Sequence, residues 1–171
     1  MRIFLDPGHG GSDPGAAKII KESQYTLIYA LELGRALKGL GFEVNYSRTS
    51  DSDVSLAERC RMANTWKADY FISIHFNAGG GTGIETFALA AGGNAERLAK
   101  AVQSPLIAHT GMRDRGVKFA NFQVLRDTLM PAVLIELGFL TNKADCALLR
   151  EPAFQDKIAL GIAFGILEMR A

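Results

Sequence analysis

The chain has 171 residues, enough for one domain with a single large core. Hydrophobic residues make up 48% of it and charged residues 22%, as in an ordinary globular protein. The 19 Lys and Arg nearly balance the 18 Asp and Glu, so the formal net charge is +1. This balance argues against broad electrostatic binding of nucleic acid or of an anionic membrane. We therefore expect neither partner, and we expect a monomer.

The N-terminal segment opens as a strand. Residues 2–5 lack the basic region and apolar stretch of a secretion signal, so either the protein has no such signal or this sequence begins after one. No apolar run approaches the roughly 18 residues of a membrane-spanning helix. The two cysteines, Cys60 and Cys146, lie far apart in apolar helical segments, which predicts buried free thiols rather than a disulfide.

The first third of the chain is expected to form a strand, a loop, a helix and a second strand. The strand at residues 3–5 leads into a glycine-rich loop, and a helix is expected at 23–38. Two glycines end this helix, and the second strand follows at 42–46. The expected apolar stripe of the helix consists of Leu27, Leu31, Gly34 and Leu37.

The rest of the chain continues the alternation of strands and helices. Ser55 and Glu58 form a capping box at the start of a second helix. Another helix starts at about residue 94, and Pro105 predicts a break and a fresh start within it. Two helices close the chain. Further strands are expected at 70–74, 84–89 and 132–135. The pattern predicts an α/β layered fold in one domain, residues 1–171.

Three of the expected strands end in a polar residue that can take part in chemistry. Strands at the start, the middle and the end of the chain lead to His9, His75 and Glu136. Ligands of open α/β sheets bind beyond the carboxyl ends of the strands, and neighbouring parallel strands would bring these side chains together. Glu22, near the start of the first helix, reaches the same edge.

Each of these residues alone has a simpler interpretation. A single His at a strand end is more often a hydrogen-bonded structural residue than a ligand. Glu22 suits the first turn of a helix, where the helix dipole favours an acid. Glu136 is harder to explain this way, because it lies in apolar sequence where an unpaired carboxylate is costly. Burial would raise its pKa, which suits a general acid or base.

Taken together, His9, Glu22 and His75 match the ligand set of a catalytic zinc site, which leaves the fourth position to water. Asp6 and Asp13 are candidates to orient the ring of His9. Spacing alone leaves both interpretations open: a zinc site, or separate structural residues.

The remaining polar features predict no other site. His109 lies at the end of an expected helix, and we interpret it as a surface residue. The glycines of 8–10 and of 79–83 lack the further residues that dinucleotide or phosphate loops require, so neither segment is expected to bind a phosphate.

Sequence blocks along nearly the whole chain resemble the zinc-dependent type 3 class of N-acetylmuramoyl-L-alanine amidases. The blocks occur in the family's order, at residues 3–16, 22, 47–51, 55–59, 63–64, 68–77, 83–85, 115–118 and 131–142. The family's zinc histidines fall on His9 and His75, its zinc glutamate on Glu22 and its catalytic glutamate on Glu136. The residues beside Glu22 depart from the family pattern, but it is the only acidic residue over positions 14–31.

This resemblance implies a three-layer α/β/α fold with a mostly parallel sheet of about six strands flanked by helices. It also implies one Zn²⁺ ion and peptidoglycan as the substrate. The reaction would cleave the amide between the lactyl group of N-acetylmuramic acid and L-alanine of the stem peptide. Glu85 is either a second acid lining the site or a solvent-facing strand residue. Arg115 and Lys118 either bind stem-peptide carboxylates or form a solvated charge pair.

Two rival functions remain open at this point. A zinc peptidase acting within the stem peptide would use the same ligands and carboxylate. A non-catalytic, zinc-stabilised wall-binding module would normally fill all four metal positions with protein ligands, and only three are evident. We expect the protein to act on the bacterial cell wall, as a phage lysin, a mother-cell lytic enzyme of sporulation, or a domain of a larger secreted protein.

Overall fold

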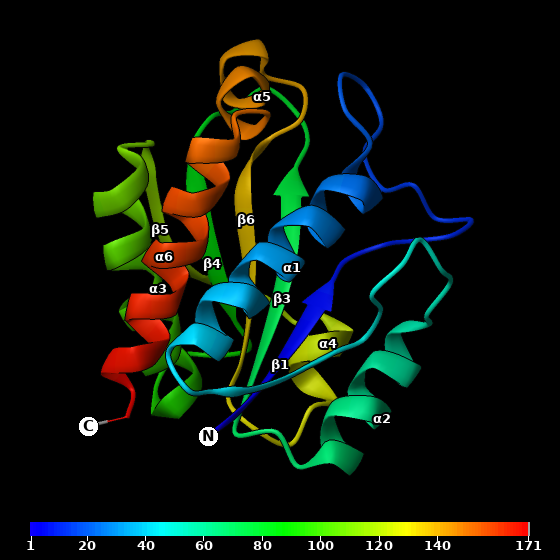
Figure 1. The fold of residues 1–171 in the computed structure, drawn as a ribbon, viewed down its shortest axis with the longest axis vertical. Coiled ribbons are helices and arrows are strands. Elements are labelled where there is room, and N and C mark those ends of the chain that lie inside the picture. The colour runs from blue at the N-terminus through cyan, green and yellow to red at the C-terminus, as the bar shows by residue number, and fades with distance from the viewer. Residues whose placement is uncertain (171) are drawn as a thin grey trace.

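A computed structural model describes residues 1–170, which form one α/β domain with a six-stranded sheet between two layers of helices (Figure 1). The strands are β1 (Arg2–Pro7), β2 (Glu43–Tyr46), β3 (Tyr70–Asn77), β4 (Ile84–Ala88), β5 (Asp114–Phe119) and β6 (Ala132–Phe139). The helices are α1 (Glu22–Gly39), α2 (Leu56–Trp66), α3 (Gly93–Thr110), α4 (Gln123–Arg126), α5 (Lys143–Leu149) and α6 (Pro152–Glu168). The predicted fold class is confirmed.

The strand order places the chemically interesting strand ends side by side. The order is β2-β1-β3-β6-β4-β5, and the first four strands run parallel to one another. Strand β4 runs antiparallel to β6 and parallel to β5, so the last two strands point the other way. The carboxyl ends of β1, β3 and β6 therefore lie next to one another, as the sequence predicted.

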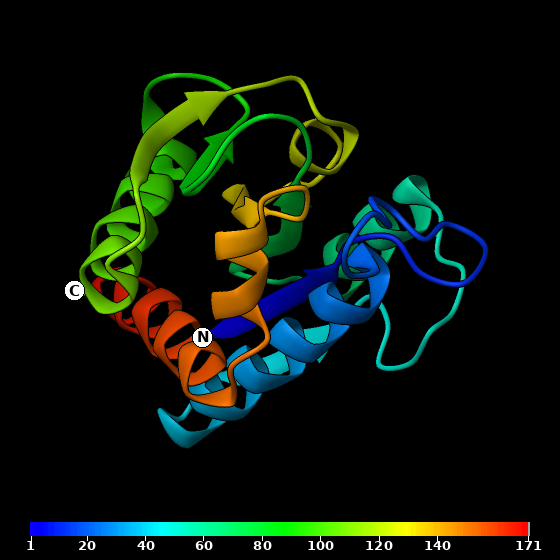
Figure 2. The same ribbon diagram turned by 90° about the horizontal axis from the view of Figure 1, so that it is seen from above.

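Two cores of unequal size cover the two faces of the sheet. Helices α1, α3, α5 and α6 pack on one face over the larger core, which includes Ile72 and Ile74 of β3 (Figure 2). The smaller core lies under α2 and α4 and includes Phe4 and Phe71. Each fully buried large side chain contributes roughly 1.5–3 kcal/mol. Because α2 and α4 are short, they leave part of their face of the sheet open.

The structure corrects the predicted break in the third helix. Helix α3 runs unbroken from Gly93 to Thr110 through Pro105. Two glycines of α6 allow the backbones of the two helices to approach closely. A Cβ on Gly161 would lie 2.7 Å from the Cα of Leu106, and one on Gly165 would lie 2.2 Å from the carbonyl oxygen of Ala101. Helix α3 thus continues past Pro105, although the proline removes one helical hydrogen bond.

The predicted apolar stripe of α1 is partly wrong. Gly34 and Leu37 are buried, but Leu31 is 39% exposed and Leu27 is only half-buried. The buried face of α1 includes Thr26 instead, whose hydroxyl donates to the carbonyl oxygen of Gly8 at 2.7 Å. A polar residue occupies a core position because it holds the loop after β1.

Strand β5 and the short helix α4 were not predicted at all. Residues 114–119 contain three charged side chains and a glycine, so they show no alternating apolar pattern. Both cysteines are free and buried, as predicted. None of the helices within residues 1–170 combines the length and the apolarity that crossing a membrane requires.

Candidate active site

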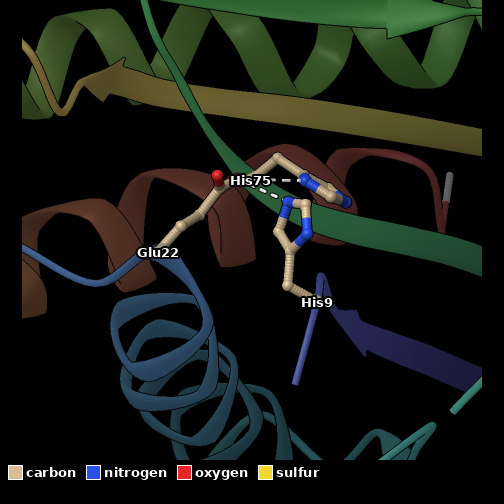
Figure 3. A group of neighbouring side chains, drawn as sticks. All are labelled: His9, Glu22 and His75. Carbon is tan, nitrogen blue, oxygen red and sulfur yellow. Dashed lines mark hydrogen bonds and ion pairs between the residues drawn. The ribbon is translucent and has the colours of Figure 1, made fainter. Parts of the chain in front are cut away.

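Three side chains converge at the carboxyl ends of β1 and β3 and the start of α1: His9, Glu22 and His75 (Figure 3). His9 lies in the loop after β1 with a φ of 59°, a left-handed conformation that residues other than glycine rarely adopt. Glu22 is the first residue of α1, and its side chain points toward both imidazoles. Gly8, which precedes His9, leaves room for the ring of His75, because a Cβ on Gly8 would lie 2.2 Å from Cε1 of that ring.

The distances between these groups suit a shared cation. Oε1 of Glu22 lies 3.1 Å from Nε2 of His9 and 3.2 Å from Nδ1 of His75. The ring centroids of the two histidines are 4.9 Å apart, and one ligand atom from each of the three residues lies within 4.8 Å of the others. The cluster therefore presents two imidazole nitrogens and a carboxylate to one point.

Hydrogen bonds from outside the cluster fix the orientation of two of its members. The backbone N–H groups of Ala16 and Phe76 donate to the two oxygens of Glu22, at 2.9 and 3.0 Å. On the far side of the His9 ring, Nδ1 lies 2.8 Å from Oδ2 of Asp13. Asp13 thus orients His9, as the sequence suggested.

The suggested role of Asp6 at the His9 ring is wrong. Its buried carboxylate accepts hydrogen bonds from Ser47, Ser73 and Arg59 instead. Arg59 also donates to the carbonyl oxygen of His9 at 2.7 Å. Asp6 therefore acts on the backbone of the ligand loop, through a buried ion pair, and does not touch the imidazole.

Sequence reasoning missed the two arginines that hold this loop. Arg48, which is 4% exposed, donates to the carbonyl oxygens of Pro7, Gly8 and Ser23. Arg59, which is 3% exposed, pairs with Asp6 as described above. Both arginines lie in segments that resemble the family, but nothing in those segments shows that the side chains are buried.

The cluster perturbs the acid–base behaviour of its members. Burial alone would lower the pKa of His9, but hydrogen bonds and charge attraction from Glu22 and Asp13 outweigh it and raise that pKa to about 9. Burial alone would raise the pKa of Glu22, yet hydrogen bonds from His75, His9 and the backbone of Ala16 hold it well below its usual range. Glu22 is therefore ionised at neutral pH.

Glu136 lies beside the cluster, in the carboxyl half of β6. It pairs in register with His75 of β3, so the two side chains share one face of the sheet. Its buried Oε2 has no hydrogen-bond partner among residues 1–170. Burial is the main cause that raises the pKa of Glu136 to about 7, with the charges of Glu22 and Glu85 adding to it and those of the histidines opposing it. An unpaired carboxyl group with this pKa is suited to transfer a proton near neutrality.

Two cavities adjoin the cluster, and His9, His75 and Leu56 line both. The cavity on the β6 side has a volume of about 330 Å³ and is also lined by Glu22, Glu136 and Asn77. The cavity on the α2 side has a volume of about 490 Å³ and extends to Asp13 and Asp53. The cluster is therefore accessible from both cavities.

The structure decides the alternatives for Glu85. It is buried, with 4% exposure, so it is not a solvent-facing strand residue. Arg115 and Lys118 both pair with its buried carboxylate, so they are not merely solvated surface charges. His109 takes no part in the site. It is half-buried at the end of α3, where its ring stacks on Phe164 of α6.

The fold matches the solved structures of N-acetylmuramoyl-L-alanine amidases. The crystal structure of an N-acetylmuramoyl-L-alanine amidase from Clostridium difficile 630 matches 99% of this chain and 96% of its own, with a TM-score of 0.95 and 38% identity. The catalytic domain of the amidase CwlV from Bacillus (Paenibacillus) polymyxa var. colistinus gives a TM-score of 0.94 and 36% identity, over 99% and 97% of the two chains.

The sequence comparisons identify the family. The family profile described as N-acetylmuramoyl-L-alanine amidase matches residues 3–168. The amidase CwlM of Bacillus licheniformis is 46% identical over 170 residues, which are 97% of this chain and 67% of that relative. The chain belongs to the N-acetylmuramoyl-L-alanine amidase family, as the resemblance in the sequence implied.

Proposed function

We propose that this protein hydrolyses the amide between the lactyl group of N-acetylmuramic acid and L-alanine of the stem peptide. In this proposal His9, Glu22 and His75 hold one zinc ion, and Glu136 is the general acid and base. One observation carries the proposal: the three ligand atoms converge within 4.8 Å, and an unpartnered carboxyl group stands beside them in the same cavity.

The donor set fits a catalytic zinc site. Two histidines and one glutamate leave a fourth coordination position for water, whereas structural zinc sites usually have four protein ligands. When bound, zinc supplies a water whose pKa is lowered to about 7 and polarises a carbonyl group. The hydrogen bonds on Glu22 and the contact between His9 and Asp13 restrict how the ligands can turn, as partners outside the ligand shell do in such sites.

Glu136 is suited to both proton transfers of the reaction. With a pKa of about 7, it is partly ionised at neutral pH and can accept a proton from the attacking water. Once protonated, it can donate that proton to the departing amine of L-alanine. Between the two transfers Oε2 of Glu136 can hold the proton, because this atom has no hydrogen-bond partner within residues 1–170.

Product analysis of digested peptidoglycan tests this proposal. We expect new amino termini on L-alanine, no new reducing sugar ends, loss of cleavage after treatment with a chelator, and recovery when zinc is added back. New amino termini on other residues would instead identify a peptidase acting within the stem peptide. New reducing ends would indicate a glycosidase, which normally uses two carboxylates and no metal. Binding to the wall without any cleavage would indicate a non-catalytic module.

A further inference from the structure

A row of polar side chains continues from the active site across the open face of the sheet. His75 pairs in register with Glu136, and Glu136 pairs with Glu85 of β4. Lys118 of β5 pairs with Phe87, two residues after Glu85 and therefore on the same face. The row thus crosses β3, β6, β4 and β5 and leads from the proposed metal ligands to the edge of the sheet. The proposed function uses only His75 and Glu136 of this row.

The far half of the row is a cationic cluster built around one buried carboxylate. The Oε1 atom of Glu85 accepts a hydrogen bond from the side chain of Asn77 at 2.8 Å. Its Oε2 atom accepts one from Nε of Arg115 at 2.6 Å and also contacts the ammonium group of Lys118. Two cations share one anion, so the cluster carries an excess positive charge.

Both cations remain accessible to a ligand. The side chains of Arg115 and Lys118 are 25% and 39% exposed, whereas that of Glu85 is 5% exposed. The guanidinium of Arg115 lies over the ring of Phe139, 4.8 Å from its centroid, which fixes the plane of the group. Within residues 1–170, only its Nε has a hydrogen-bond acceptor. Its two terminal nitrogens therefore remain free to bind a carboxylate in the paired geometry that arginine favours.

The cluster begins where the cavity on the β6 side ends. Asn77 lines that cavity and also donates to Glu85. From β6 to β5 is two strand spacings, about 10 Å, which about three residues of an extended peptide would span. The other cavity extends instead to Asp13 and Asp53, which would repel an anionic peptide. The cations beyond the β6-side cavity and the carboxylates in the α2-side cavity thus favour binding of an anionic peptide toward β5.

We propose that Arg115 and Lys118, anchored by Glu85, form a subsite for a free carboxylate on the second or third residue of the stem peptide. This subsite sets which way the substrate lies across the active site: the peptide toward β5, and the uncharged muramyl group toward the cavity on the α2 side. The inference rests on the proposed function, because it assumes that a stem peptide is the substrate.

Steady-state kinetics on soluble muramyl tripeptides test this subsite. One tripeptide has free carboxylates on its second and third residues, one has both as carboxamides, and two have a single carboxamide each. We expect the double carboxamide to raise KM about tenfold with kcat little changed, which corresponds to about 1.4 kcal/mol of binding. The singly amidated peptides identify the residue whose carboxylate is bound.

Two variants connect the effect to the cluster. Arg115→Met keeps an apolar contact with Phe139, and Lys118→Met removes only the ammonium group. Each is expected to raise KM for the free carboxylate substrate severalfold and to reduce the discrimination against the carboxamide. The control Lys100→Met removes an exposed lysine of α3 that pairs with Glu96, and it should behave as the wild type. Thermal unfolding shows whether each variant is folded.

The outcomes separate the two proposals. If the wild type cleaves the free carboxylate tripeptide and the double carboxamide with KM values within twofold of each other, the subsite is wrong and the proposed function stands. The subsite is also wrong if folded Lys118→Met discriminates between the free carboxylate and the carboxamide substrates as the wild type does. If the wild type cleaves none of the four tripeptides but cleaves another bond of the cell wall, the proposed function fails and the subsite fails with it.

Discussion

Glu136 and His75 stand side by side because β6 and β3 are parallel neighbours that pair these two residues in register. The carboxyl group is thus fixed next to one of the proposed zinc ligands by backbone hydrogen bonds, although the two residues are far apart in the sequence. Since Oε2 of Glu136 has no partner within residues 1–170, its removal breaks no hydrogen bond on that atom.

Glu136→Gln should therefore lower turnover at least about a hundredfold, the low end for a general acid–base residue. Zinc content and thermal stability should stay close to those of the wild type, because the swap keeps the shape and removes the basicity. Glu32→Gln on α1 is the matched control and should retain full turnover. Loss of the metal in Glu136→Gln would show that Glu136 is a ligand, and the roles proposed above would be wrong.

Asp13→Ala should weaken zinc binding about 10–100-fold, the usual effect of removing a partner that orients a ligand. The reason is the 2.8 Å contact between Oδ2 of Asp13 and Nδ1 of His9. Competition with a chromogenic chelator measures the affinity. Asp156→Ala, on α6, removes an exposed carboxylate that pairs with Arg35 and is the control. Equal zinc affinity in Asp13→Ala and the wild type would contradict the orienting role.

Glu85 should make part of the protein's stability depend on acid pH. Burial alone would raise its pKa, but hydrogen bonds from Lys118, Asn77 and Arg115 lower it. A carboxylate with a lowered pKa stabilises the fold above its unfolded pKa, and this contribution is lost as pH falls through the folded pKa.

We therefore expect Glu85→Gln to be less stable than the wild type at pH 7, by about 1–3 kcal/mol. The difference should begin to narrow as the pH falls below the pKa of an unfolded glutamate, about 4.3, and should be lost once the pH is below the lowered pKa of folded Glu85. Urea unfolding at pH 7, 5 and 3 measures it, with Glu43→Gln on the exposed strand β2 as the control. A difference that stays constant across these pH values would rule out the linkage.

Gly165→Ala should destabilise the protein, by about 1–3 kcal/mol, because the new Cβ would meet the carbonyl oxygen of Ala101 at 2.2 Å. Within a helix, the same substitution usually stabilises by up to about 1 kcal/mol. Gly39→Ala at the end of α1 has nothing within 4 Å of the new Cβ and should show that ordinary gain. Relative to the wild type, the Tm should fall for Gly165→Ala and rise for Gly39→Ala in thermal unfolding.

The part of the site that the sequence predicted is the part that strand ends reveal. An apolar run followed by a polar residue predicted His75 and Glu136 as candidates, although both strands continue past these residues, to Asn77 in β3 and to Phe139 in β6. The parallel neighbours then brought these positions together. For Glu22 the local sequence has an ordinary explanation, because the helix dipole favours an acidic residue at a helix start.

The parts that the sequence could not predict depend on tertiary contacts. Asp6 looked like a partner of His9 because it is close in sequence, but a buried pair with Arg59 engages it instead. Strand β5 has no apolar pattern, since it lies at the sheet edge and carries Arg115 and Lys118 on the open face. Pro105 does not break α3, and the close packing of α6 against this helix through Gly161 and Gly165 is a tertiary contact that the local sequence does not show.

Titration of the metal-free protein with zinc, followed by calorimetry, tests the central claim most directly. We expect one tightly bound ion per chain in the wild type and in Glu136→Gln. His9→Ala, Glu22→Ala and His75→Ala should each lose tight binding, since a site with three protein ligands would keep only two. The account would be contradicted if the wild type bound no zinc, or if any of these three alanine variants bound it as tightly as the wild type.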